Sequence, residues 1–270
     1  MKLVGATHIE NRIRAFKREE RIPIIPYITA FDPDKEATLE HLKYLAEANP
    51  AVIELGFPFS DPVADGPTIQ KAMVRALAQN PTVDEYLKIV SQFKNLYPHI
   101  PVVCMTYYNI VFRRGLKTMV EEAVRAGLDG FIIPDLPLEE ASSWLKANRG
   151  YNLATIFLGA PTSSLERIRK IASASTGFFY YVSLTGITGA RTKLPEDLVE
   201  RLKAIRSLIK RPLAVGFGIS RPEHVAMLRS YCDAIVVGSA LVQIIEKEGK
   251  KAGPKLRDFL NKLTYESSQS

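Results

Sequence analysis

The sequence of 270 residues predicts an α/β protein, a (β/α)8 TIM barrel with an extra N-terminal helix, organised as a single domain over residues 1–270. Apolar runs of strand length alternate with helical segments eight times, which is the element order of a closed parallel barrel. Most of these runs are apolar at consecutive positions, as strands covered on both faces are. The rival fold, a doubly wound open sheet, needs phosphate-binding glycines after its first strand. This chain has AFDP at that place and carries its glycine-rich turns late, which favours the barrel.

The predicted strands follow one another along most of the chain. They are expected at residues 24–30, 51–55, 101–107, 130–135, 153–159, 178–184, 212–218 and 233–238. Helix starts are predicted from capping-box spacing, in which Ser or Thr precedes Glu by three positions. This spacing occurs at Thr7–Glu10, Thr82–Glu85, Ser163–Glu166 and Ser220–Glu223. The first pair opens the extra N-terminal helix, where Ile9, Ile13 and Phe16 recur at helical intervals.

The composition is that of a globular protein with a full core. Hydrophobic residues make up 46% of the chain, yet no run approaches the roughly 20 apolar residues of a membrane helix. The first 21 residues lack the apolar core of a signal peptide, so a cytoplasmic location is expected. The net charge is +7, but the cations are interleaved with acids, which argues against nucleic-acid binding. Cys104 and Cys232 lie in apolar runs without metal-ligand spacing and are expected to be reduced core thiols.

Glu54 is the first candidate for catalysis, because the chemistry of such barrels lies at the carboxyl ends of the strands. Within the second predicted strand, Val52 and Glu54 share one face, while Ile53 and Leu55 take the other. A carboxyl group buried there has its pKa raised towards neutrality, which suits an acid–base catalyst. The structural alternative is a glutamate satisfied by an arginine or by backbone donors.

Two further acids, Asp61 and Asp65, follow in the same stretch, ELGFPFSDPVADGPT. Each has a structural alternative as well. Asp61 precedes Pro62 and is a typical turn residue. Asp65 precedes a helix that is expected from about Thr68, and it could simply cap that helix.

Glycines gather after the late strands. Gly216, Gly218 and the pair Gly238-Ser239 each stand where a strand ends and a helix begins, which is the arrangement of a backbone phosphate site. Tight turns alone are the alternative. The segment SLTGITGAR (183–191) follows the sixth strand, and its glycines and polar residues are typical of an active-site lid.

The positions of the histidines and lysines argue against several kinds of catalytic site. The four histidines, His8, His41, His99 and His224, lie away from the carboxyl ends of the predicted strands. This argues against Ser-His-Asp catalysis and against a multi-histidine zinc site, and no metal is expected. Lysines are also missing from the strand ends, so a Schiff-base aldolase has no evident nucleophile. Carboxylates remain as the acid–base groups.

The segment ELGFPFSDPVADGPTIQ (54–70) closely resembles the signature of the tryptophan synthase alpha subunit family. Further blocks that resemble this family occur in the same order: YITAFDPD (27–34), MTYYNIVFRRG (105–115), IIPDLP (132–137), YYVSLTGITGAR (180–191), GFGIS (216–220) and VVGSALV (236–242). The resemblance implies a carbon–carbon lyase of L-tryptophan biosynthesis. Such an enzyme cleaves indole-3-glycerol phosphate to indole and D-glyceraldehyde 3-phosphate without a cofactor.

The resemblance also implies roles for individual residues. Glu54 and Asp65 correspond to the catalytic Glu and Asp, the first as the proton shuttle and the second as the carboxylate beside the indole N1–H. Tyr27 and Tyr107 would line the indole pocket, and Tyr180 would lie near the catalytic Glu. Thr188 would hydrogen-bond the catalytic Asp when the lid closes. The phosphate would be bound by Gly189, Gly218, Gly238 and Ser239.

The family further implies a partner, a pyridoxal-phosphate-bearing beta subunit in an α2β2 assembly that receives indole through a tunnel. The loop with Asp61 and Pro62 would face it. Phe31 departs from the pattern, because many family members have a small residue there. Two other functions stay open: a chiefly regulatory or scaffolding subunit with weak activity alone, and a sister barrel enzyme for another phosphorylated indole or anthranilate substrate.

Overall fold

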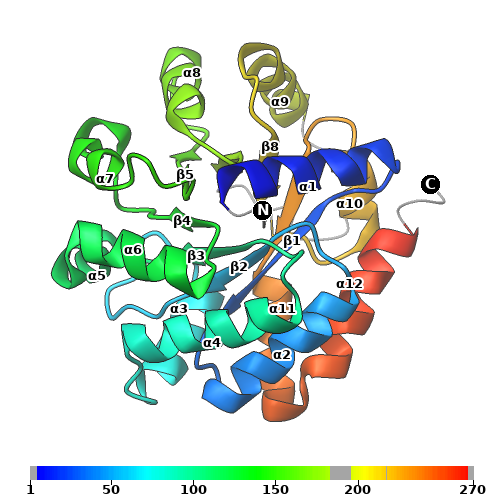
Figure 1. Ribbon diagram of the computed structural model, residues 1–270. Coiled ribbons are helices and arrows are strands. Elements are labelled where there is room, and N and C mark those ends of the chain that lie inside the picture. Colours follow the sequence, from blue (N-terminus) through cyan, green and yellow to red (C-terminus); the bar gives the residue numbers. More distant parts are fainter. Residues whose placement is uncertain (1–4, 183–195, 217, 267–270) are drawn as a thin grey trace.

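The computed structural model describes residues 5–182, 196–216 and 218–266, which form a nearly closed barrel of parallel strands surrounded by helices (Figure 1). The strands are β1 (Ile24–Thr29), β2 (Ile53–Gly56), β3 (Val102–Met105), β4 (Gly130–Ile132), β5 (Ala154–Ile156), β6 (Leu158–Gly159), β7 (Phe179–Val182), β8 (Leu213–Gly216) and β9 (Ala234–Val237). They pair in the order β5-β4-β3-β2-β1-β9-β8-β7-β6. The predicted (β/α)8 barrel is confirmed, since each predicted run overlaps a strand.

The fifth predicted run, 153–159, forms two short strands instead of one. β5 pairs with β4 and β6 pairs with β7, and Phe157 stands between them. The backbone N–H of Tyr180 donates to the carbonyl oxygen of Phe157 at 3.3 Å. The nine strands therefore occupy eight positions of the barrel, and the sheet is interrupted between β5 and β6.

Helices follow the strands around the barrel. They are α1 (Ala6–Arg18), α2 (Lys35–Glu47), α3 (Pro67–Leu77), α4 (Val83–Leu96), α5 (Tyr108–Arg114), α6 (Leu116–Ala126), α7 (Ser142–Ala147), α8 (Leu165–Ala174), α9 (Glu196–Leu208), α10 (Pro222–Leu228), α11 (Ser239–Glu248) and α12 (Gly253–Glu266), with 3-10 turns at Leu138–Glu140 and Gly249–Lys251. α1 is the predicted extra N-terminal helix. In the described part of the chain, no helix combines the length and apolarity that a membrane span requires.

The capping predictions were correct for one helix of the four. Thr82 caps α4, and its Oγ1 accepts from the N–H of Glu85 at 3.2 Å. The other three helices begin after a different residue than predicted: Gly5 precedes α1, Ser164 caps α8 and Arg221 precedes α10. For α10 the shift follows from Pro222, whose fixed φ and missing N–H suit the first position of a helix.

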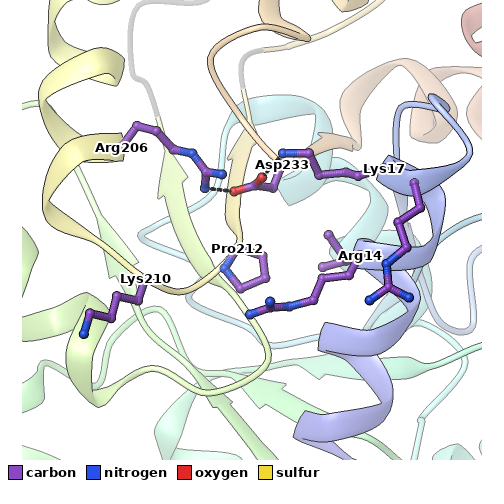
Figure 2. A pocket seen from close by; sticks show the side chains of 8 residues that line it. Arg14, Lys17, Arg206, Lys210, Pro212 and Asp233 are labelled. Atoms are coloured by element: carbon purple, nitrogen blue, oxygen red, sulfur yellow. Dashed lines mark hydrogen bonds and ion pairs between the residues drawn. The ribbon is translucent and has the colours of Figure 1, made fainter.

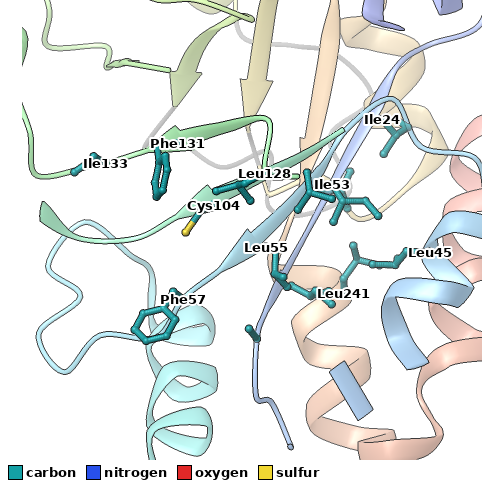
Figure 3. Close-up of a cluster of buried hydrophobic side chains, with 14 of the residues drawn as sticks. Ile24, Leu45, Ile53, Leu55, Phe57, Cys104, Leu128, Phe131, Ile133 and Leu241 are labelled. Atoms are coloured by element: carbon teal, nitrogen blue, oxygen red, sulfur yellow. The ribbon is translucent and has the colours of Figure 1, made fainter. Parts of the chain in front are cut away.

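Apolar side chains form two layers, one inside the barrel and one between the strands and the helices. On β2, Ile53 and Leu55 belong to the outer layer together with Leu45 of α2 and Leu241 of α11 (Figure 3). Val52 belongs to the inner layer. The alternation predicted for this strand is confirmed, and it turns Glu54 into the barrel. Cys104 and Cys232 are free thiols buried in the outer layer, as predicted.

The apolar face of α1 packs against the inner layer at the amino ends of the strands, and buried acids hold both ends of this helix. Asp129, just before β4, holds the first end. Its Oδ1 accepts from the Gly5 N–H at 2.8 Å and lies 2.9 Å from His8 Nδ1. Its Oδ2 accepts from Lys94 Nζ and from the Val102 N–H, both at 2.9 Å. One carboxylate thus ties α1 to α4 and to β3.

Asp233, just before β9, holds the last turn of α1. It is 5% exposed, it pairs with Lys17 of α1 and with Arg206 of α9, and it accepts from the Leu213 N–H of β8 at 2.9 Å. The pattern repeats that of Asp129. Each acid stands just before a strand and accepts from the amide at the start of the previous strand, Val102 of β3 or Leu213 of β8. Each also binds a cation from the helix before that previous strand, Lys94 of α4 or Arg206 of α9.

Candidate active site

A cavity of about 520 Å³ opens at the carboxyl ends of the strands. Its wall brings together residues that are far apart in the sequence: Tyr27, Glu54, Ala64, Asp65, Gly66, Ile69, Met105, Ile132, Pro134, Leu158, Tyr180, Val182, Gly216, Gly218, Val236, Gly238 and Ser239. Seven of these are predicted site residues: Tyr27, Glu54, Asp65, Tyr180, Gly218, Gly238 and Ser239. The predicted carboxylates and the predicted phosphate turns therefore border one cavity.

Glu54 projects from β2 into this cavity and is only 3% exposed. Among the described residues, none donates a hydrogen bond to its buried Oε2. A glutamate that served only the fold would have an arginine or backbone donors around it, because an unpaired buried carboxyl group destabilises the folded state. The structural alternative for Glu54 therefore finds no support in the described contacts.

The two carboxyl groups on the cavity wall have different pKa values. Burial raises the pKa of Asp65 to about 6, although the hydrogen bond from Tyr107 lowers it. Burial raises the pKa of Glu54 to about 8, and the negative charge of Asp65 adds to this. Asp65 ionises first, and its charge then hinders ionisation of Glu54. Near pH 7 the pair holds one charge on Asp65 and one proton on Glu54.

Tyr107 lies behind Asp65, and it is not among the residues of the cavity wall. Its hydroxyl donates to Asp65 Oδ2 at 2.6 Å and accepts from the Ala64 N–H at 3.0 Å. Its ring stacks on Phe59 with the ring centroids 4.9 Å apart. Tyr107 therefore holds the loop after β2 and the carboxylate of Asp65, whereas the resemblance placed it in the indole pocket. Tyr27 does line the cavity.

Gly216 is a residue whose part in the site the sequence reasoning missed. A Cβ atom built on it would lie 2.9 Å from the hydroxyl oxygen of Tyr180, so the glycine leaves room for that hydroxyl on the cavity wall. The sequence analysis placed Gly216 in a candidate phosphate turn and gave it no role beside Tyr180. The apolar wall residues Ile132, Leu158 and Val182 were missed too. The only signal in the sequence that could have identified these three residues is that their side chains point into the barrel near the ends of predicted strands.

The late turns have the backbone that a phosphate site requires. Gly218 has φ +63°, a conformation that favours glycine. Gly238 precedes α11, and Ser239 is the first residue of that helix. The first backbone N–H groups of a helix have no partner within it and attract anions. Two predicted site residues, Thr188 and Gly189, lie outside the described residues, as does the whole 183–191 segment.

The loop with Asp61 and Pro62 bends back on itself. The Asp65 N–H donates to the Pro62 carbonyl oxygen at 3.0 Å, and the Ser60 hydroxyl donates to the Asp61 carboxylate. Val63 at its tip is 83% exposed. A second hollow, of about 430 Å³, lies between this loop and α5 and is lined by residues that include Phe59, Ser60, Asn109, Ile110 and Arg113.

Phe31 does not narrow the cavity. Its side chain is buried in the outer layer, where its ring meets Phe57 edge-on at 6.4 Å. Its backbone has φ +66°, which is uncommon for a residue with a side chain. The Phe31 N–H donates to Thr38 Oγ1 at 2.8 Å. The departure from the family pattern therefore concerns the packing of α2 on the barrel.

Three comparisons with known proteins agree. The family profile described as "Tryptophan synthase alpha chain" matches residues 13–268. The tryptophan synthase alpha chain of Pyrococcus abyssi is 46% identical over 241 residues, which cover 89% of this chain and 96% of that protein. That of Methanosarcina acetivorans is 44% identical over 260 residues, 96% of this chain and 93% of that one. A solved chain from the tryptophan synthase complex of Pyrococcus furiosus superposes with a TM-score of 0.83 and 39% identity, covering 90% of this chain and 98% of that one. The chain therefore belongs to the tryptophan synthase alpha chain family.

Proposed function

We propose that this chain is the alpha subunit of tryptophan synthase, a lyase that cleaves indole-3-glycerol phosphate to indole and D-glyceraldehyde 3-phosphate. The reaction is a retro-aldol cleavage and the penultimate chemistry of L-tryptophan biosynthesis. The observation that carries the proposal is the unpaired, buried Glu54 opposite an ionised Asp65 in a cavity bordered by the late glycine turns. Membership of the family supports it.

Glu54 is proposed as the acid–base catalyst. Cleavage of the bond to indole C3 requires a base for the hydroxyl group of the side chain and a proton delivered to C3. A carboxyl group with a pKa of about 8 holds a proton near neutral pH and can also release it, so one group can serve both steps. The free Oε2 supports this role because no described donor competes with a substrate for it.

Asp65 is proposed to stabilise the indole nitrogen. When C3 is protonated, the ring nitrogen becomes cationic and its N–H becomes more acidic. Tyr107 fixes the carboxylate of Asp65, so the carboxylate can stabilise the positive charge on the indole nitrogen without moving. Electrostatic stabilisation is most effective when the stabilising group is already in place. At the far side of the cavity, Gly218, Gly238 and Ser239 are proposed to bind the phosphate group, and Tyr27 and Tyr180 to contact the rest of the substrate.

Glu54→Gln tests the assignment of the catalyst. The change keeps the size of the side chain and removes its ability to exchange a proton. Removal of a general acid–base group lowers the rate of a reaction by roughly 10²–10⁴-fold. Because Glu54 acts in two steps, kcat for indole formation should fall by at least this much. Glu166→Gln, on the exposed face of α8, is the matched control and should keep wild-type turnover. A Glu54→Gln protein with substantial turnover would show that another group performs the chemistry.

The proposed partner is the pyridoxal-phosphate-bearing beta subunit, in an α2β2 assembly. Two exposed apolar side chains support this partner: Val63 is 83% exposed and Phe112 is 63% exposed. Between them, the loop after β2 and helix α5 line the hollow of about 430 Å³. The same surface supports the second candidate function, a subunit that mainly regulates or positions the beta subunit. Indole formation measured with and without the beta subunit separates the two, because full activity alone contradicts a mainly regulatory role.

We also propose that residues 1–270 form a single domain and that the protein is cytoplasmic. One sheet that takes strands from Ile24 to Val237 supports the first proposal. The biosynthetic role of the family supports the second.

A further inference from the structure

A second charged cavity lies at the opposite end of the barrel from the active-site cavity. Its volume is about 290 Å³, and its wall consists of Ile13, Arg14, Lys17, Arg18, Arg206, Lys210, Pro212 and Asp233 (Figure 2). Pro212 and Asp233 stand just before β8 and β9, so the cavity belongs to the amino ends of these strands. We call it the base cavity. Nothing in the proposed lyase reaction uses it.

The one carboxylate of the base cavity is already satisfied. Asp233 is buried, pairs with Lys17 and with Arg206, and accepts from the Leu213 N–H at 2.9 Å. Figure 2 shows Lys17 and Arg206 reaching it from opposite sides. A carboxylate with three donors has little capacity left to neutralise other cations, and two cations already exceed its single charge.

Three further cations surround the base cavity with little compensation. Arg14 lies 3.9 Å from Glu10, the limit of an ion pair, and Glu10 is shared with Arg211. Within the described part of the chain, Arg18 and Lys210 make no ion pair. All three side chains are on exposed residues, so each can turn towards a bound anion. The wall therefore carries five cations against one carboxylate.

Helix dipoles account for only part of this arrangement. Lys17 and Arg18 lie in the last turn of α1, and Arg206 lies in the last turn of α9, where cations offset the partial negative charge of a helix end. That effect is local to each helix and favours a cation at either end separately. The dipole effect therefore does not explain why the cations of both helix ends surround the same cavity. Nor does it explain the apolar side of that cavity, which Ile13 and Pro212 form.

We propose that the base cavity binds a small polyanion with two or more phosphate groups, of the diphosphate or triphosphate class. Arginine presents a planar set of donors that matches phosphate oxygens in pairs, and several cations around one hollow favour a ligand with several charges. The volume fits a small molecule. Binding would bridge α1 and α9, the two helices that Asp233 already joins.

Tripolyphosphate is the probe, titrated into the full-length protein by calorimetry at about 0.15 M salt, where long-range attraction is largely screened. The test variant combines Arg14→Gln, Arg18→Gln and Lys210→Gln, which leaves the Asp233 pairs intact. The matched control combines Arg149→Gln, Arg169→Gln and Lys88→Gln, three exposed residues elsewhere on the molecule. Both variants lose two arginines and one lysine, so their net charges are equal.

We expect one site in the wild-type protein. The test variant should bind at least about tenfold more weakly, since one lost hydrogen bond to a charged group corresponds to a factor of that order. The control should bind within about twofold of the wild type, and both variants should keep wild-type turnover and circular dichroism. Equal weakening in the two variants would overturn the proposal, because it would show general attraction to a basic protein.

Two other outcomes would overturn it as well. Tripolyphosphate that still binds the test variant and is displaced by glycerol 3-phosphate would be in the active-site cavity. A single-stranded RNA that binds more tightly than tripolyphosphate, and loses that binding in the test variant, would assign the base cavity to nucleic acid. The result for the base cavity is independent of the lyase reaction, because binding is measured without substrate turnover.

Discussion

Glu54→Gln should stabilise the protein at neutral pH while it removes activity. The pKa of Glu54 is raised from 4.5 to about 8 on folding, so the folded state disfavours the charge that the unfolded state carries. The stabilising contribution of this group is complete below pH 4.5 and is lost as the pH rises towards 8. At about 1.36 kcal/mol per unit, the loss at pH 7 is about 3 kcal/mol. Glutamine carries no charge and avoids this loss.

The measurement is the free energy of unfolding of both proteins from chemical denaturation between about pH 4.5 and pH 8. The two proteins should differ least near pH 4.5, where Glu54 is protonated in the folded state and still half protonated in the unfolded state, and the variant should gain up to about 3 kcal/mol by pH 7. Constant effects of the amide group cancel, because only the change with pH is compared. Glu166→Gln should follow the wild type at every pH. Parallel curves for Glu54→Gln and wild type would refute the buried, protonated state of Glu54 and with it the proposed proton shuttle.

Two further predictions concern the carboxylate and tyrosine hydroxyl groups at the cavity. Tyr107→Phe removes the donor that lowers the pKa of Asp65, so the acid limb of the pH profile of kcat should move to higher pH; an unmoved limb would show that Asp65 does not set it. Gly216→Ala places a Cβ 2.9 Å from the Tyr180 hydroxyl and should lower kcat/KM by up to about 10²-fold, whereas the same change in a Tyr180→Phe background should lower it less. An equal effect of Gly216→Ala in both backgrounds would argue against a role for the Tyr180 hydroxyl.

The parts of the fold that depend on local pattern could be predicted from the sequence. Strand positions follow from apolar runs, and the inward direction of Glu54 follows from the alternation of Val52 and Ile53 on either side of β2. The break in the fifth strand at Phe157 could not be predicted in this way. That run is as apolar as the others, and the interruption depends on how the neighbouring strands pair with it.

The direction of the Glu54 side chain could be predicted because Glu54 stands on a strand, whereas the direction of Tyr107 could not. Tyr107 lies two residues beyond the end of β3, so the alternation of the strand no longer gives its direction, and it contacts Asp65 instead of the cavity. The base cavity had no signal in the sequence at all. Arg14 and Arg206 are almost two hundred positions apart, and the sequence shows only scattered cations.

The two acids that hold α1 have a mechanical consequence. The strand pairing of the barrel changes at Phe157, between β5 and β6, and α1 lies across the amino ends of the strands (Figure 1). Asp129, which precedes β4, holds the first end of α1, and Asp233, which precedes β9, holds its last turn. A chain cut at Phe157 would therefore still have its two pieces joined by α1, in addition to the pairing of β1 with β9 and the packing of α2 against α12.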